Sequence, residues 1–161
     1  FRDNRITPIY EGTNSVQAID LVYRKILNNK IFEKYIAQLS NEVKDFAKDN
    51  KLSLFADKFF KYLELLNNFT LWLGEKNKSS KDDVSAACND YLKVLGYIAL
   101  AHSWLKILKV SHSKLKENKT FYEDKINTAK YYFDKILPRV QSHYLSAITG
   151  SDTMMKSNFN W

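Results

Sequence analysis

The chain has 161 residues, of which 45% are hydrophobic and 27% are charged, and this suits one soluble domain with its own core. Only four Gly and two Pro occur, which argues against a turn-rich β fold. The single cysteine, Cys88, excludes an internal disulfide framework and fits a reducing compartment, so we expect a cytoplasmic protein. No apolar run approaches the ~18 residues of a membrane span, and the first residues carry no signal-peptide pattern.

The net charge of +7 has two interpretations: a solvated, lysine-rich surface, or a surface that binds nucleic acid or phosphate. The lysines are dispersed along the chain, as Lys44, Lys93 and Lys130 illustrate, and arginine is scarce after Arg24. No compact motif of basic and aromatic residues is present. This pattern favours the solvated surface, and we expect no nucleic-acid partner.

Apolar side chains recur with the helical period of 3.6 residues along five segments, and strand-like alternation is absent. The predicted helices cover residues 15–28, 30–48, 52–73, 82–115 and 120–149. The fourth is apolar on nearly all faces between Tyr91 and Leu108, which is typical of a helix in the middle of a bundle. The expected fold class is therefore all-α: an antiparallel bundle of about five helices, preceded by a short loop.

Local signals predict where these helices begin and end. Three pairs are expected to cap helix starts: Asn14 with Gln17, Ser80 with Asp83, and Thr120 with Glu123. Gly74 is expected to end the third helix, and residues 75–83 (EKNKSSKDD) to form the clearest loop. Pro138 should kink the last helix, because proline lacks the N–H that the helix needs.

The side chains that could bind a metal are scattered. His102, His112 and His143 lie far apart in the sequence, without the three- or four-residue spacing that places two ligands on one helical face. Cys88 lies among alanines, as a small core residue does. We expect no metal site.

The loop ahead of the first helix is where polar residues suggest chemistry. Glu11 lies between Tyr10 and Gly12, just before Thr13 and Asn14. Gly12 permits a ligand to approach the backbone, the amides at the helix start favour a developing oxyanion, and desolvation beside an aromatic ring would raise the basicity of a carboxylate. These residues alone leave two interpretations open: a catalytic base, or a Glu that interacts with the helix dipole.

Residues 1–26 read FRDNRITPIYEGTNSVQAIDLVYRKI. This stretch resembles the end of the catalytic domain of acyl-CoA dehydrogenases, whose pattern is R-D-x-[RK]-I-x-x-I-Y-E-G-T-x-x-I-Q. Val16 replaces the usual Ile, and the matching positions are Arg2, Asp3, Arg5, Ile6, Ile9, Tyr10, Glu11, Gly12, Thr13 and Gln17.

The resemblance implies a role for each residue of this loop. Glu11 would be the base that removes the α-proton of an acyl-CoA thioester, while the β-hydrogen leaves as hydride to the N5 atom of FAD. Tyr10 and Gly12 would contribute to substrate binding, and Thr13, Asn14 and Ser15 would lie against FAD. A thioester α-proton is weakly acidic, so a positioned base is needed, and the hydride acceptor must be a cofactor.

A second resemblance covers the later helices. Residues 90–107 (DYLKVLGYIALAHSWLKI) and 129–155 (AKYYFDKILPRVQSHYLSAITGSDTMM) are similar to the C-terminal helical extension of the long acyl-CoA dehydrogenases, a subgroup that includes the 3-methylmercaptopropionyl-CoA dehydrogenase type. We therefore expect residues 1–29 to end the catalytic domain and residues 30–161 to form the extension domain.

These resemblances imply an acyl-CoA substrate, FAD, electron-transfer flavoprotein as the electron acceptor, a homo-oligomer away from membranes, and a role in fatty acid metabolism. The sequence opens in mid-motif at Phe1 and lacks the domains that build the family's flavin and acyl pockets. We therefore expect a fragment that is inactive alone. In an alternative interpretation, the region is a helical interaction or oligomerisation module without catalysis of its own.

Overall fold

The computed structural model describes residues 13–28 and 31–156. Within them the chain is helical and contains no strand, so the expected all-α bundle is confirmed. The elements are α2 (Asn14–Ile19), η2 (Asp20–Leu27), α3 (Ile31–Ala47), α4 (Ser53–Ser79), α5 (Lys81–Lys114), α6 (Lys119–Tyr131), η3 (Tyr132–Ile136), α7 (Arg139–Ala147) and α8 (Asp152–Met155). The short loop expected before the first helix lies outside the described residues.

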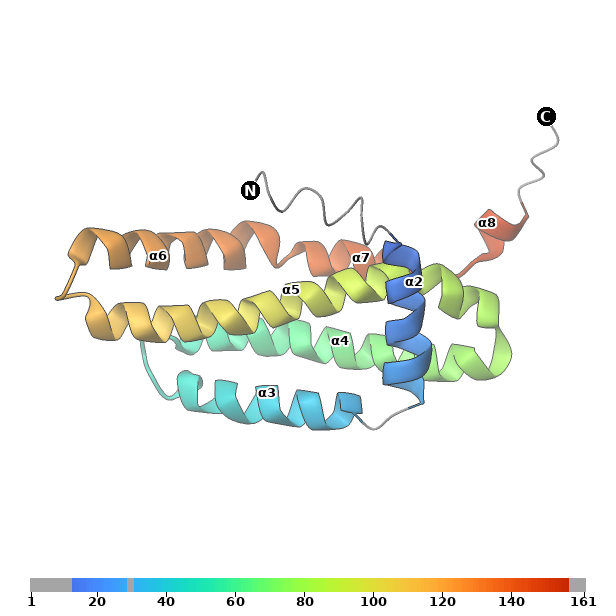
Figure 1. The fold of residues 1–161 in the computed structure, drawn as a ribbon, viewed down its shortest axis with the longest axis horizontal. Coiled ribbons are helices and arrows are strands. Elements are labelled where there is room, and N and C mark those ends of the chain that lie inside the picture. Colours follow the sequence, from blue (N-terminus) through green and yellow to red (C-terminus); the bar gives the residue numbers. More distant parts are fainter. Residues whose placement is uncertain (1–12, 29–30, 157–161) are drawn as a thin grey trace, which may run out of the picture.

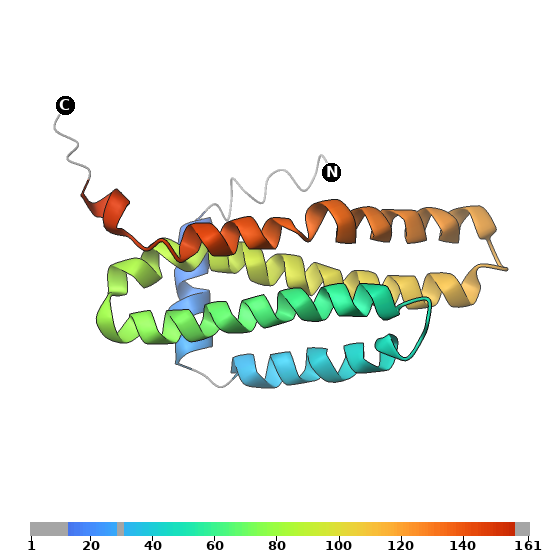
Figure 2. The ribbon, with the colours of Figure 1, turned by 180° about the vertical axis from the view of Figure 1, so that it is seen from behind.

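Most of the helices run along the long axis of the molecule, and one helix crosses them. Helices α3, α4 and α5 and the rod formed by α6, η3 and α7 alternate in direction, whereas α2 crosses the bundle steeply (Figures 1 and 2). The connections between the antiparallel helices are short, as expected for neighbours in a bundle. No helix in the described part of the chain combines the length and the apolar character needed to cross a membrane.

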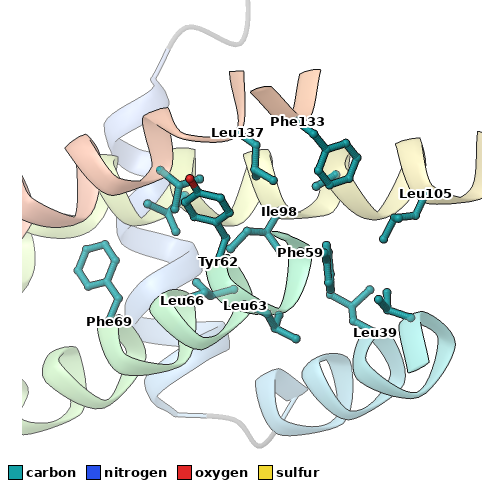
Figure 3. Packing of buried hydrophobic residues seen from close by; sticks show 14 of the residues in the cluster. Leu39, Phe59, Tyr62, Leu63, Leu66, Phe69, Ile98, Leu105, Phe133 and Leu137 are labelled. Carbon is teal, nitrogen blue, oxygen red and sulfur yellow. The ribbon is translucent and has the colours of Figure 1, made fainter. Parts of the chain in front are cut away.

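Helix α5 forms the centre of the bundle, as its sequence predicts. It packs against α2, α3, α4, α6 and α7. Figure 3 shows labelled side chains of α3, α4 and η3 packed with those of α5 in one core, which includes the fully buried Ile98. Aromatic rings fill much of this space: Phe69 meets Tyr91 edge to face at a centroid distance of 5.1 Å, and Phe55 meets Phe133 at 5.2 Å. Edge-to-face pairs of this kind add to the stabilisation from area burial.

The prediction that Gly74 ends the third helix was wrong. Helix α4 continues through Gly74 to Ser79, so most of the expected loop at 75–83 is helical and only Ser80 separates α4 from α5. Ser80 caps α5 as predicted, and its Oγ accepts a hydrogen bond from the Asp83 N–H at 3.3 Å. The extra turns of α4 bring Lys76 within reach of Asp83, which gives this polar segment a tertiary role.

Two other predicted caps were also wrong. Helix α2 begins at Asn14 after an N-cap at Thr13, which makes no side-chain capping bond. Helix α6 begins at Lys119, one residue earlier than expected, and its N-cap is Asn118, whose Oδ1 accepts from the Phe121 N–H at 3.2 Å. Asn is among the best N-cap residues, so Asn118 fills that position before Thr120 can.

Pro138 interrupts the last long helix, as predicted. The backbone first widens into the π-helical segment η3, where the Leu137 N–H donates to the Tyr132 carbonyl, five residues back, at 2.8 Å. A new helix, α7, then begins at Arg139. The missing N–H of proline explains the break, and the wider turn before it leaves Phe133 and Leu137 buried in the core.

A buried carboxylate at the start of α5 joins the end of α4 to the segment that follows α7. Asp83 is only 8% exposed; its Oδ2 accepts from Lys76 Nζ at 2.8 Å, and its Oδ1 accepts from the N–H and the Oγ of Ser151, each at 2.8 Å. Gly150 permits this approach because its φ is +80°. A Cβ at Gly150 would lie 2.9 Å from Asp83 Oδ1, so only glycine fits without displacement.

Replacing Gly150 with Ala should destabilise the fold by about 2 kcal/mol, because the left-handed backbone is unfavourable for Ala and the new methyl meets the carboxylate. A matched control is Gly74→Ala: a Cβ there would meet no described atom within 4 Å, inside a continuous helix. It should stabilise by about 0.5 to 1 kcal/mol. Urea unfolding followed by circular dichroism measures both. Equal effects of the two substitutions would contradict this account of Gly150.

The Asp83 contacts also predict a dependence of stability on pH. The bond from Lys76, followed by those from Ser151, holds the pKa of Asp83 well below its usual value near 4. A depressed carboxyl pKa contributes stability that is present above the unfolded pKa and lost as pH falls below it. The free energy of unfolding should therefore fall between about pH 4 and pH 2.

The variant Asp83→Asn should lose about 2 kcal/mol at pH 7 and show a shallower acid decline than the wild type, because the charged acceptor is gone. Asp82→Asn, at the exposed neighbouring position, is the control and should cost under about 1 kcal/mol. Urea titrations at several pH values test both points. Parallel acid declines in wild type and Asp83→Asn would show that Asp83 is not the titrating group.

Candidate functional site

The loop singled out by the sequence leads directly into α2. Its proposed base, Glu11, and the proposed substrate-binding residues Tyr10 and Gly12 lie outside the described residues. Thr13, Asn14 and Ser15, the expected FAD contacts, occupy the N-cap and the first two positions of α2, and all three are exposed. Their polar side chains are therefore available to a ligand.

Helix α2 and its continuation η2 are fastened to the first half of α5. Ala18 and Val22 are fully buried on the face that meets the bundle. The Tyr23 hydroxyl donates to the Lys81 carbonyl at 3.0 Å and lies 3.2 Å from Ser85 Oγ. This combination of apolar burial and directional bonds sets the position of α2 along α5.

A second polar contact lies at the beginning of α2. The Asn89 side chain, on α5, donates from Nδ2 to Ser15 Oγ at 3.2 Å. Ser15 is thereby held against α5 by a residue 74 positions later in the chain. Of the three expected FAD contacts, Ser15 is the one whose side chain has a partner on the extension helix.

A hollow of about 400 Å³ opens at this contact. It is lined by Asn14, Ser15, Asn89, Leu92 and Lys93. The described residues that line it supply one cation, two amides and a hydroxyl, with one apolar wall, and no carboxylate. Such a donor set suits an anionic, hydroxyl-rich group such as a phosphate with its sugar, so the residues present fit the phosphate-bearing part of FAD.

Sequence reasoning found two of these residues and missed the others. Asn14 and Ser15 belong to the motif, whereas Asn89 and Lys93 lie on α5 and resemble ordinary surface residues in the sequence. In the sequence, Lys93 is one of many dispersed lysines. Only the crossing of α2 over α5 brings it beside Ser15, so no local signal could have identified it.

Two of the three histidines and the single cysteine are engaged in structural contacts. His102 Nε2 lies 2.9 Å from Glu42 Oε2, and burial lowers the pKa of His102. His143 Nδ1 lies 2.8 Å from Asp90 Oδ1. Cys88 donates from Sγ to the Val84 carbonyl at 3.1 Å, and burial raises its pKa to about 11, which leaves it a poor nucleophile.

The described residues include no group of three or more His, Cys, Asp or Glu side chains arranged to hold a metal ion. The hollow at the start of α2 therefore remains the place where predicted binding residues and a shaped surface coincide. Asn14, which lines the hollow, closely follows the proposed base Glu11 in the sequence.

Two comparisons with known proteins show what the chain is similar to. The sequence model described as "Acetyl-CoA dehydrogenase C-terminal like" matches residues 39–158, which include most of α3 and all later helices. The chain is also similar to a butyryl-CoA dehydrogenase of Syntrophomonas wolfei subsp. wolfei: 27% of 150 aligned residues are identical, and the match covers 86% of this chain.

The alignment covers only 24% of that relative, so the chain spans about a quarter of its length. The family match extends over roughly three quarters of this chain and coincides with the bundle built around α5. The chain therefore belongs to the acetyl-CoA dehydrogenase C-terminal-like family.

Proposed function

We propose that this chain is the C-terminal region of an FAD-dependent acyl-CoA dehydrogenase of the long type, and that Glu11 is its catalytic base. The observation that carries the proposal is the Y-E-G-T motif at residues 10–13 running directly into a helix that is packed on the family's bundle. The relative's name, a butyryl-CoA dehydrogenase, supports the same reaction class. We infer α,β-dehydrogenation of an acyl-CoA thioester.

The domain boundary in this proposal lies near residue 30. Residues 1–29 would end the catalytic domain and residues 30–161 would form the extension. The family match begins at residue 39, after α2 and η2, which supports a change of unit in this region. Packing crosses the boundary, since Ala18 and Val22 from the first unit are buried in the same core as α5.

In the proposed reaction Glu11 takes the α-proton of the thioester, and the backbone of Glu11 and Gly12 holds the thioester carbonyl, where negative charge develops. Tyr10 contributes to substrate binding. Thr13, Asn14 and Ser15 would hold FAD, which supplies the hydride acceptor that no side chain provides. The exposed polar side chains at the start of α2 fit that task.

The proposal extends to partners that the resemblance implies. Electron-transfer flavoprotein would receive the electrons, and the enzyme would act in cytoplasmic fatty acid metabolism. The long enzymes that include the 3-methylmercaptopropionyl-CoA dehydrogenase type are the subgroup we favour. We further propose that the 161 residues by themselves neither retain FAD nor oxidise an acyl-CoA. The span of about a quarter of the relative's length supports this, since most of a flavin pocket would lie elsewhere.

The base assignment predicts the effect of Glu11→Gln in the protein expressed from its complete reading frame. Glutamine has nearly the same shape but cannot accept the α-proton, so turnover should fall by about 10³-fold. Dye-linked acyl-CoA oxidation measures turnover, and flavin absorbance should show that bound FAD is unchanged. Glu33→Gln, at an exposed position of α3, is the control and should retain activity. Wild-type turnover in Glu11→Gln would exclude Glu11 as the base.

A second candidate function is self-association of the extension, which a groove between α5 and α6 favours. The groove encloses about 460 Å³ and is mostly apolar, with Trp104, Ile107, Val110, Phe121 and Tyr122 in its lining. Val110 and Phe121 are 48% and 49% exposed. Exposed apolar patches of this kind are typical of protein interfaces. Self-association is compatible with the catalytic proposal.

If this groove joins two copies, Val110→Glu should weaken self-association by at least about tenfold, because a carboxylate would be buried in an apolar contact. Sedimentation velocity over a concentration series measures the association constant. Leu145→Glu, at an exposed apolar position on α7, carries the same charge change outside the groove and should have no effect. Equal association of wild type and Val110→Glu would refute an interface at this groove.

A further inference from the structure

We propose that Lys93 binds the diphosphate of FAD, so that the helical extension forms part of the cofactor site. This inference depends on the proposed function, since it requires that FAD binds at the start of α2. It adds a residue from α5 to the FAD contacts that the resemblance implies within this chain, Thr13, Asn14 and Ser15.

Lys93 borders the same hollow as two of the proposed FAD contacts. Two elements distant in sequence line one hollow: α2 contributes Asn14 and Ser15, and α5 contributes Asn89, Leu92 and Lys93. Asn89 and Lys93 are four residues apart, so they lie on the same face of α5, one turn from each other. Because Asn89 bonds to Ser15 at 3.2 Å, Lys93 stands one helical turn beyond that contact. Figures 1 and 2 both show α2 crossing α5.

The charge of Lys93 suits a diphosphate. The diphosphate is the anionic part of FAD, and Lys93 is the one cation among the described residues that line the hollow. Lys93 has no hydrogen-bond or ion-pair partner within the described part of the chain, whereas Lys106 is held by Glu42 at 2.8 Å and Lys76 by Asp83 at 2.8 Å. A phosphate would therefore gain the ammonium without displacing a carboxylate, and lysine binds phosphate as a point charge.

The size of the hollow and its neutral side chains also suit a diphosphate. A volume of about 400 Å³ is too small for the whole of FAD but suits a diphosphate with an adjoining sugar. The amides of Asn14 and Asn89 can donate to phosphate or accept from sugar hydroxyls. Leu92 forms an apolar wall beside them. The site thus combines one charge for attraction with neutral groups for orientation.

A diphosphate also occurs in coenzyme A, so the same cation could serve the substrate. The neighbours of Lys93 decide in favour of FAD: Asn14 and Ser15 are the residues that the motif assigns to the cofactor, whereas the substrate residues precede them. If this is correct, the extension stabilises the holoenzyme through the cofactor as well as through packing.

The experiment uses the protein expressed from its complete reading frame, stripped of flavin and titrated with FAD. Lys93→Glu should weaken FAD binding by about tenfold or more, and Lys93→Arg should remain within about threefold of wild type. Lys116→Glu is the control: it makes the same change in net charge in the connection between α5 and α6, at the far end of α5 from α2. Its FAD affinity should match wild type.

Circular dichroism melts establish that the variants fold, which is expected because Lys93 is exposed. Unchanged FAD affinity in folded Lys93→Glu would overturn the inference, as would equal losses in Lys93→Glu and Lys116→Glu. A raised KM for acyl-CoA with unchanged FAD affinity would assign Lys93 to coenzyme A and likewise overturn it. A wild-type protein that binds no FAD would contradict the proposed function itself, so the two failures are distinct.

Discussion

Helix α5 imposes the constraint on which the rest of this structure depends, because a helix of 34 residues with apolar side chains on most faces must be covered from several directions at once. Residues such as Tyr91, Ile98 and Leu105 recur every seven residues along one stripe of α5, and all three are fully buried. Burying each large side chain contributes about 1.5 to 3 kcal/mol, so exposing the buried side of α5 to water would be costly. The antiparallel partners α4 and α6–α7 pack along α5, and α2 packs across it.

Apolar burial is not directional, so polar contacts determine how the helices are aligned. The Tyr91 hydroxyl lies 2.8 Å from Thr70 Oγ1, which relates α5 to α4, and the Tyr132 hydroxyl donates to the Tyr97 carbonyl at 2.7 Å, which relates the last helical rod to α5. Asp83 likewise relates the start of α5 to Lys76 on α4 and to Ser151 after α7. No buried side-chain nitrogen or oxygen in the described residues lacks a partner. If the helices slid along one another, these bonds would break and leave unsatisfied buried groups. This penalty selects one alignment.

The packing of α2 on α5 joins the residues that follow the motif to the core of the bundle. In the sequence the motif and the extension look like two successive units, yet Ala18 and Val22 share a core with the extension and Ser15 bonds to Asn89. In the proposed function, a segment that positions a base and a cofactor would need a rigid support, and the centre of the bundle would provide it. The extension is therefore better described as the foundation of the proposed site than as an appendage to it.

Helical periodicity was sufficient to predict the fold class, the central place of α5 and the break at Pro138, because these follow from the spacing of apolar residues and from the chemistry of proline. Helix ends were harder: Gly74 and the polar residues after it match a loop in composition, but the bond between Lys76 and Asp83 favours continuing the helix. Asn118 displaced Thr120 as a cap because two acceptable cap residues stood close together.

The sequence by itself determined the helices, the motif around Glu11 and the family resemblance, since each is carried by residues close together in the chain. Only the tertiary structure decided that Ser15, Asn89 and Lys93 border one hollow. That juxtaposition spans 74 residues from Ser15 to Asn89 and depends on where α2 crosses α5. A crossing point is set by the fit of two packed surfaces, and no local pattern of residues encodes it.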